Sequence, residues 1–154
     1  MKIRKAKLSD VNEISYLNSL LMKYHIKFDR YWNVKKDARK TYSKYVRKMI
    51  RSPKATVFVA DDGGKIVGFT SGKIEKRPPI FKIEKCGKVD STFVLKQYRR
   101  RGIGKKLIDE LIKWFKSKGI EYVELEVDTR NKIALKAWKK FKFKRFLIKK
   151  KKKI

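Results

Sequence analysis

Apolar residues recur at every third or fourth position in four stretches of the chain. Because a side chain returns to the same face of an α-helix after about 3.6 residues, this spacing predicts amphipathic helices. Ser9 is suited to cap the first helix, and Pro53 and Gly119 indicate the ends of the second and third. The predicted helices span about residues 11–24, 35–51, 103–118 and 131–141.

Short apolar runs, some alternating with charged residues, predict strands between these helices. Two runs flank the turn sequence DDGG at 61–64, which indicates a β-hairpin. The order β-α-α-β-β-β-α-β-α-β predicts an α/β (α+β) fold, a mixed sheet with helices packed on it. The unit from Lys88 to Val127 should contribute two parallel strands. The predicted strands span about residues 2–7, 55–60, 65–74, 88–95, 120–127 and 141–149.

The composition adds a strong positive charge to this picture. The chain of 154 residues suits one domain over 1–154, with a basic tail at about 149–154. Its 45 Lys and Arg outnumber 15 Asp and Glu, and the formal net charge is +30. Such a surface attracts nucleic acid, phosphorylated cofactors, acidic proteins or anionic lipid. Lysine enrichment with a single Gln and a single Cys is typical of thermophilic proteins.

The sequence lacks the residues for disulfides, for common metal sites and for a membrane span. The single Cys86 excludes an internal disulfide and a cysteine-based zinc site, and the single His25 excludes a pair of histidine ligands. No apolar run approaches the ~18 residues of a membrane span, and no apolar stretch follows the basic N-terminal residues as in a signal peptide. We therefore expect a cytoplasmic protein with no metal and no membrane contact.

The sequence YRRRGIGKK, from Tyr98 to Lys106, joins a predicted strand to a predicted helix. A helix start has unpaired N–H groups and a partial positive charge. Glycines allow a ligand to approach the backbone closely, so the loop suits phosphate oxygens. Lys105 and Lys106 conflict with the helix dipole, and a bound anion would relieve that conflict. The spacing of Gly102 and Gly104 fits neither GxxxxGK[ST] nor GxGxxG.

What fits is R-x-x-G-x-G, from Arg99 to Gly104. With this loop, Val94 before it and the N-x-x-A pattern of Asn131 and Ala134 after it, the chain resembles the GNAT superfamily of N-acetyltransferases. The family carries [QR]-x-x-G-x-[GA] between a strand and a long helix. The resemblance extends over essentially the whole chain. It implies a largely antiparallel twisted sheet with a central parallel strand pair, and transfer of acetyl from acetyl-CoA to a primary amine.

The resemblance also implies which residues bind acetyl-CoA. The pyrophosphate would lie on backbone N–H groups of the glycine loop, and the preceding strand would bind the pantetheine arm. One N–H group of that strand would polarise the thioester carbonyl. Asn131 would contact the cofactor or order the last helix. The implied cofactor-binding residues are Val94, Leu95, Arg99, Arg100, Arg101, Gly102, Ile103, Gly104, Lys105 and Asn131.

Carboxylates on the central strands are the usual general bases in this family. Asp90, four residues before Val94, is the first candidate, and Glu124 and Glu126 are alternatives. Each could instead pair with Lys or Arg. Relatives commonly carry a Tyr general acid where this chain has Trp138, whose indole N–H does not give up a proton near neutral pH. Water or another Tyr would then protonate the thiolate, or the protein is a slow enzyme or a non-catalytic CoA binder.

The sequence does not determine which amine accepts the acetyl group. The acceptor could be a protein Lys or N-terminus, a polyamine, an amino acid or an aminoglycoside. The positive surface disfavours cationic amines and favours acidic peptides or anionic assemblies such as the ribosome. An alternative function is a nucleic-acid- or ribosome-binding module on the same fold. The protein could be a monomer or a homodimer. Aromatic residues that lie where relatives bind acceptors, or that pack the helices, are Phe28, Tyr31, Trp32, Tyr42 and Tyr45.

Overall fold

Five strands form one sheet, in the order in which they occur along the chain, in a computed structural model that describes residues 1–154. The first four strands pair antiparallel, and the fifth lies parallel to the fourth. This mixed sheet confirms the predicted fold class and the parallel pair. The strands are β1 (Lys2–Lys5), β2 (Ala55–Asp62), β3 (Lys65–Lys76), β4 (Lys85–Val94) and β5 (Val123–Glu124).

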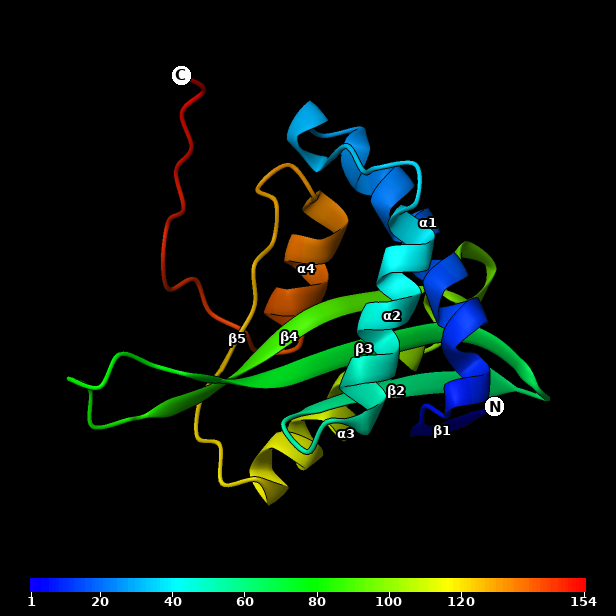
Figure 1. Cartoon of the computed structure of the whole chain (residues 1–154), viewed down its shortest axis with the longest axis horizontal. Coiled ribbons are helices and arrows are strands. Elements are labelled where there is room, and N and C mark those ends of the chain that lie inside the picture. The colour runs from blue at the N-terminus through cyan, green and yellow to red at the C-terminus, as the bar shows by residue number, and fades with distance from the viewer.

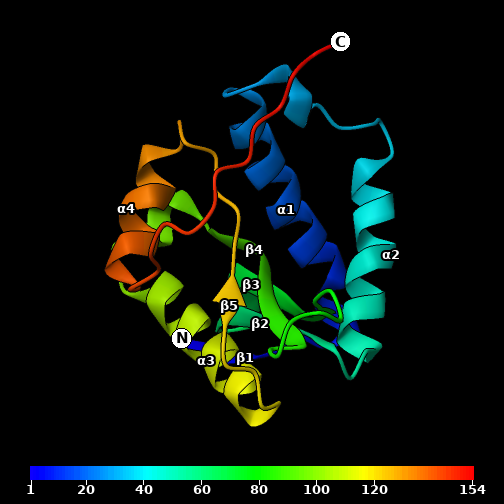
Figure 2. The same cartoon turned by 90° about the vertical axis from the view of Figure 1, so that its left-hand side faces the viewer.

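Helices cover both faces of the sheet (Figure 1). Helices α1 (Val11–Ile26) and α2 (Ala38–Arg51) lie on one face, and α3 (Ile103–Ser117) and α4 (Lys132–Lys140) lie on the other (Figure 2). None of these helices has the length and apolar character needed to cross a membrane. Three short 3₁₀ turns complete the structure: η1 (Leu8–Asp10), η2 (Arg30–Trp32) and η3 (Lys96–Tyr98).

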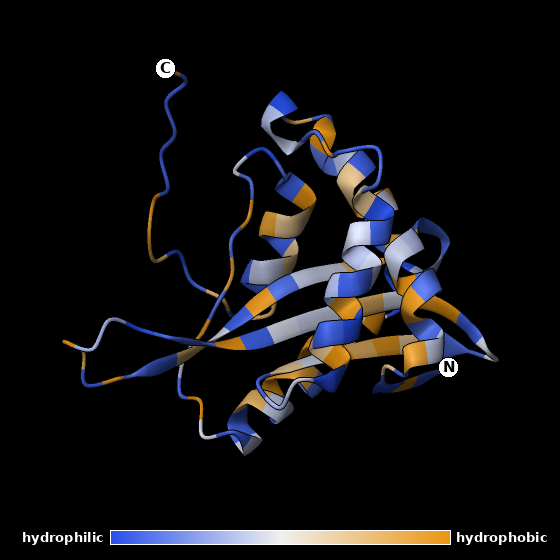
Figure 3. Cartoon of the chain, in the orientation of Figure 1, coloured by the Kyte–Doolittle hydropathy of each residue, from blue (hydrophilic) through white to orange (hydrophobic).

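Each face of the sheet has its own hydrophobic core. Leu107, Leu111 and Phe115 of α3 are fully buried on one face, whereas Ile14 of α1 and Val46 of α2 are buried on the other. Burial of each such side chain contributes roughly 1.5–3 kcal/mol. Apolar colour accordingly runs through β2 and β3, and the tail is mostly hydrophilic (Figure 3). The two cores hold the sheet rigidly beneath the loops that follow β4 and β5.

Helix α1 begins at Val11, as the sequence predicts, whereas α2 begins later than its sequence predicts. Ser9 does not cap α1, because it lies inside η1. Asp10 precedes α1, but its side chain caps no N–H group of that helix: its Oδ2 accepts from the Lys7 N–H at 2.7 Å and pairs with Arg4 at 2.7 Å. This buried carboxylate ties β1 to the start of α1. Helix α2 begins at Ala38 rather than at about residue 35.

The predictions of the strands after α3 differ most from the structure. The strand expected over 120–127 is reduced to the two residues of β5, because the chain beyond it leaves β4 toward η2. The strand expected over 141–149 does not form, since so short a β5 offers almost no edge to pair with. The observed order therefore lacks the last strand. The parallel pair lies at the edge of the sheet, not at its centre.

Candidate functional site

The loop before α3 has six consecutive backbone N–H groups without a protein acceptor. They belong to Arg100–Lys105, and the first helical hydrogen bond runs from the Lys106 N–H to the Gly102 carbonyl at 3.0 Å. Arg100 and Gly102 have positive φ angles of 65° and 75°. Such turns direct successive N–H groups into one anion-binding concavity, and the start of α3 adds its dipole. The loop is thus built to receive phosphate.

Gly104 lies in the first turn of α3, where the protein itself does not require a glycine. A Cβ there would meet only the Phe141 ring, at 3.9 Å. Glycine in a helix costs about 1 kcal/mol relative to alanine. Ile103 beside it is buried in the core and anchors the loop, and Lys105 pairs with Asp109 one turn later. A small residue at position 104 leaves the free N–H groups accessible to a ligand.

The three arginines of the loop differ in their contacts. Arg99 Nε donates to the Val94 carbonyl at 2.9 Å and so fixes the loop to the end of β4. The Arg101 guanidinium lies 5.4 Å from the centre of the Tyr98 ring. Arg100 makes no hydrogen bond or ion pair within the protein, so its charge is free for a ligand. The backbone, more than the arginine side chains, forms the anion-binding surface.

Strand β4 continues for six residues past its pairing with β5, which leaves one of its edges open. The last β4–β5 pair is Lys88 with Glu124, and β4 ends at Val94. The Leu95 N–H donates to the Val67 carbonyl of β3 at 2.9 Å. Because backbone groups of a strand alternate in direction, the Val94 N–H faces the open edge. An extended ligand that carries amide groups can pair with this edge.

Val94 and Leu95 therefore differ as candidate cofactor contacts. Both backbone groups of Leu95 are used within the protein, since its carbonyl accepts from the Tyr98 N–H at 2.9 Å. The Val94 N–H has no protein acceptor on its side of β4. Val94 is thus the stronger candidate to donate to a ligand oxygen beside the phosphate loop.

Asp90 is the extra residue of a β-bulge in β4. The ladder pairs Ser91 with Ser71 of β3 and Val89 with Gly72, so Asp90 has no partner on β3. A bulge bends its strand and turns one side chain out of the regular alternation. Sequence spacing alone, which assumes strict alternation, does not give the direction of this carboxylate.

The groups around Asp90 set the charge of its carboxyl group. Water reaches the side chain, yet desolvation by the surrounding protein raises its pKa, while the Lys73 charge and the Tyr45 hydroxyl act in the opposite direction. Burial also raises the pKa of Tyr45. The sequence places Tyr45 only in a general aromatic group and gives no signal for Lys73. Tyr45 comes near Asp90 through the packing of α2 on the sheet, and Lys73 through the pairing of β3 with β4.

The two glutamates lie at the sheet edge. Glu126 pairs with Lys88 and with Lys149, each at 3.2 Å, and these contacts lower its pKa. A carboxylate held ionised by two lysines is a weaker base than Asp90. Glu124 in β5 is exposed and has no ion pair. No group of three or more His, Cys, Asp or Glu residues is arranged to hold a metal ion.

Trp138 and Asn131 both belong to α4 and its start. Trp138 packs edge-on against Phe141 and Phe143, with ring centres 5.8 and 5.4 Å away, and its indole makes no hydrogen bond. Asn131 is 6% exposed, and its Oδ1 accepts from the Ala134 N–H at 3.0 Å. Asn131 therefore orders the last helix, which is one of the two roles that the resemblance implies.

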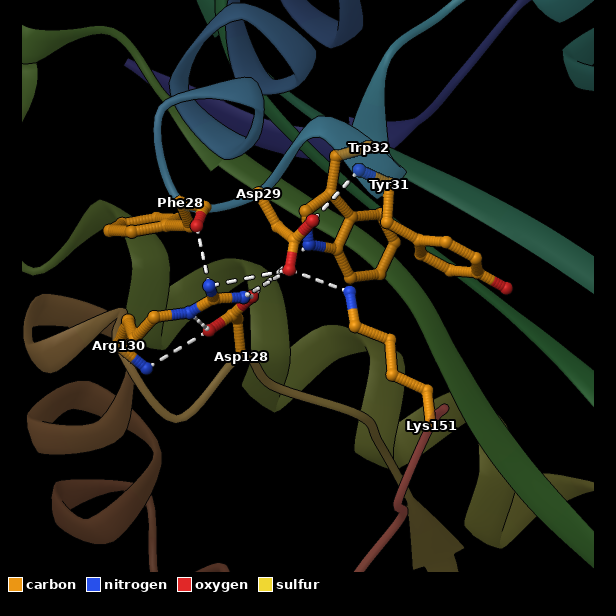
Figure 4. A network of polar contacts seen from close by, with 7 residues as sticks. All are labelled: Phe28, Asp29, Tyr31, Trp32, Asp128, Arg130 and Lys151. Atoms are coloured by element: carbon orange, nitrogen blue, oxygen red, sulfur yellow. Dashed lines mark hydrogen bonds and ion pairs between the residues drawn. The ribbon is translucent and has the colours of Figure 1, made fainter. Parts of the chain in front are cut away.

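A charged network joins the loop after α1 to the loop before α4 (Figure 4). Asp128 accepts from Trp32 Nε1 at 3.1 Å and from Arg130 at 2.8 Å, and the Arg130 contact lowers its pKa. Arg130 also donates to the Phe28 carbonyl and pairs with Asp29. The network holds the continuation of β5 away from β4, which keeps the edge of β4 open. No motif in the sequence predicts it.

Comparison with known sequences agrees with this geometry. Residues 17–143 match the profile of the Acetyltransferase (GNAT) family. An N-alpha-acetyltransferase from Sulfurisphaera tokodaii is 33% identical over 150 residues, which cover 93% of this chain and 80% of that protein. The uncharacterized N-acetyltransferase MJ1207 from Methanocaldococcus jannaschii is 32% identical over 130 residues, 80% of this chain. The chain spans about half of that relative, 53% of its length.

Solved structures share the fold at lower sequence identity. A mutant of the BH1408 protein from Bacillus halodurans aligns with a TM-score of 0.89 at 20% identity, over 100% of this chain and 99% of that one. A protein described as a predicted acetyltransferase from Clostridium acetobutylicum, crystallised with acetyl-CoA, aligns with a TM-score of 0.79 at 18% identity. That alignment covers 94% of this chain and 90% of the other. The likeness includes the sheet and the helices on both of its faces.

Proposed function

The chain belongs to the GNAT family of acetyl-CoA-dependent acetyltransferases, and we propose that it acetylates the terminal α-amino group of polypeptides. The observation that carries the donor half of this proposal is the run of six free N–H groups, Arg100–Lys105, next to the free Val94 N–H. The acceptor half rests on the 33% identical Sulfurisphaera tokodaii relative and on the charge of the chain.

Acetyl-CoA supplies a thioester whose carbonyl carbon accepts the amine. Under this proposal the N–H groups of Arg100–Lys105 hold its pyrophosphate. The Val94 N–H donates to the thioester oxygen, where negative charge develops during attack. Arg100 is free to add a charged contact to a phosphate. Further cations without a protein partner lie along α4: Lys132, Lys136, Lys139 and Lys140.

Asp90 is the proposed acceptor of the amine proton. It lies four positions before Val94, on the order of 13 Å along a regular strand, so the proton would travel through water. A terminal α-amino group has an ordinary pKa near 8, whereas a lysine side chain has one near 10.4. The α-amino group therefore releases its proton more readily to a carboxylate. This difference favours a polypeptide terminus over a lysine side chain as the acceptor.

The surface charge argues against polycationic acceptors. A net charge of +30 repels aminoglycosides and polyamines, whose several ammonium groups would approach together. Helix α2 strengthens this field, because it carries no Asp or Glu and none of its cations forms an ion pair. A polypeptide terminus brings a single amine, and acidic residues after it would be attracted. The cations of α2 are Arg39, Lys40, Lys44, Arg47, Lys48 and Arg51.

An acceptor panel that follows release of the CoA thiol tests this function. We expect release with peptides that have a free α-amino group, acidic ones best, and little release with polyamines or aminoglycosides. The same peptides with a blocked terminus and a free lysine serve as controls. Release with small amines alone would contradict the proposal. No release with any amine, together with a salt-dependent shift of RNA or DNA on a gel, would favour the nucleic-acid-binding alternative.

Trp138→Tyr should raise kcat, because a phenol can protonate the departing thiolate and an indole cannot. We expect a gain of up to about tenfold, at some loss of thermal stability since Trp138 packs against Phe141 and Phe143. Steady-state kinetics measure the gain. Trp138→Phe is the control, since it makes the same void without the hydroxyl. Equal rates for the two variants would show that no acid is missing at this position.

A further inference from the structure

A lysine of the C-terminal segment lies in a site formed by a carboxylate and an aromatic ring (Figure 4). Lys151 Nζ is 2.6 Å from Asp29 Oδ2 and 4.5 Å from the centre of the Tyr31 ring. The Tyr31 N–H donates to the other carboxylate oxygen at 2.9 Å, which fixes the orientation of Asp29. A carboxylate beside an aromatic face is a combination that binds a primary ammonium group.

The charged groups around this site have one more negative than positive charge when Lys151 is not counted. Asp29 and Asp128 carry two negative charges, and Arg130, which pairs with both, carries one positive charge. Without Lys151 the group keeps one net negative charge, on a chain whose net charge is +30. Contacts with the Lys151 ammonium, the Tyr31 N–H and Arg130 lower the pKa of Asp29 to about 2, and the Lys151 contact has the largest effect. Asp29 is therefore ionised at neutral pH and attracts a counter-charge.

The segment that supplies Lys151 is weakly attached to the rest of the chain. Beyond Phe143 it forms no helix or strand, and residues 146–148 are 78–86% exposed. Its charged contacts are the pair of Lys149 with Glu126 and the contact of Lys151 described above. Ion pairs this exposed contribute little stability. A second ammonium group can therefore displace Lys151 from its site.

The site lies between the loop after α1 and the loop that continues β5. Asp29 belongs to the loop after α1, and its partner Arg130 belongs to the loop that continues β5. Figure 2 shows the C-terminal segment crossing the β5 edge between the two helical layers. A polypeptide that reaches the free edge of β4 from this side would pass the segment and the ammonium site.

We propose that Asp29 and Tyr31 form a subsite for one lysine side chain of the acceptor polypeptide, and that Lys151 occupies this subsite in the free protein. The inference rests on the proposed polypeptide acceptor and adds a preference within that class. The tail then acts as an internal competitor of the acceptor. One net negative charge accommodates one ammonium group, which agrees with the exclusion of polycations by the rest of the surface.

Binding and kinetics of the full chain with matched peptides test the subsite. A lysine is placed in turn at each position of a short acceptor peptide, and norleucine replaces it in the matched control. Lys151→Ala should tighten binding of the best lysine peptide about two- to fivefold and leave the norleucine peptide unchanged. KM should fall by the same factor while kcat stays constant. Lys152→Ala removes the same charge from the same segment without a contact, and should change neither peptide.

Asp29→Asn completes the test, since the amide oxygen can still accept from the Tyr31 N–H. This variant should bind lysine and norleucine peptides equally and should cancel the effect of Lys151→Ala. Equal effects of Lys151→Ala and Lys152→Ala on both peptides would overturn the proposal, because they would reflect long-range charge alone. Fluorescence anisotropy with peptides whose terminus is already acetylated measures their binding to the subsite without catalysis. The subsite therefore stands or falls separately from the proposed reaction.

Discussion

Gly104→Asp is expected to weaken binding of acetyl-CoA strongly while leaving the fold as stable as before. An acidic side chain in the first turn of a helix is favourable, because it accepts from free N–H groups and complements the dipole. A Cβ at this position meets only the Phe141 ring at 3.9 Å, so the residue fits. The new carboxylate would occupy the N–H groups that the pyrophosphate needs and would repel it.

The expected loss is about 30-fold to 1000-fold in affinity, since placing like charges together costs several kcal/mol. Calorimetric titration with acetyl-CoA measures it, and thermal unfolding checks the fold. Gly104→Ala is the matched control: it should stabilise the protein by up to about 1 kcal/mol and bind acetyl-CoA nearly as well. A Gly104→Asp variant that binds acetyl-CoA normally would show that the phosphates lie elsewhere.

This loop is the part of the site that the sequence predicts best, because everything it needs is local. Gly102 has a φ of 75°, a conformation that the glycine in the sequence already indicates. The free N–H groups follow because a helix begins at Ile103. The strand before it and the helix after it are equally local. Backbone groups form the site, so its formation does not depend on the contacts of the three arginine side chains. A short motif is thus sufficient to predict this half of the chemistry.

The acceptor side depends on contacts between distant segments, which no local pattern records. Lys73 lies near Asp90 because β3 pairs with β4, and Tyr45 lies there because α2 packs on the sheet. Lys151 reaches Asp29 across more than one hundred residues. The apolar run over 120–127 is typical of a strand, but the ladder with β4 ends after two residues. Asp128 holds the continuation of β5 instead, through its contacts with Trp32 and Arg130. The strand propensity of the residues does not predict these contacts.

Asp90→Asn should lower kcat by about a hundredfold to ten-thousandfold, the usual contribution of a general base. Asn has the same shape, and the fold already disfavours the charged form of Asp90, so we expect little change in stability. Acetyl-CoA affinity should be unchanged, because the loop and the Val94 N–H are intact. Single-turnover assays at saturating acetyl-CoA separate the chemical step from binding.

The pH dependence of the reaction tests whether Asp90 acts as a base or as a structural carboxylate. Its folded-state pKa is raised, so acid removes the active, ionised form at a higher pH than for an ordinary Asp. In the unaltered protein kcat/KM should fall as the pH drops through that pKa, whereas Asp90→Asn should lack this step. Glu126→Gln is the matched control, since Lys88 and Lys149 hold that carboxylate ionised and its loss should change kcat less than about twofold. If Glu126→Gln loses more activity than Asp90→Asn, the proton leaves through the edge of the sheet, and the bulge in β4 only shapes the strand.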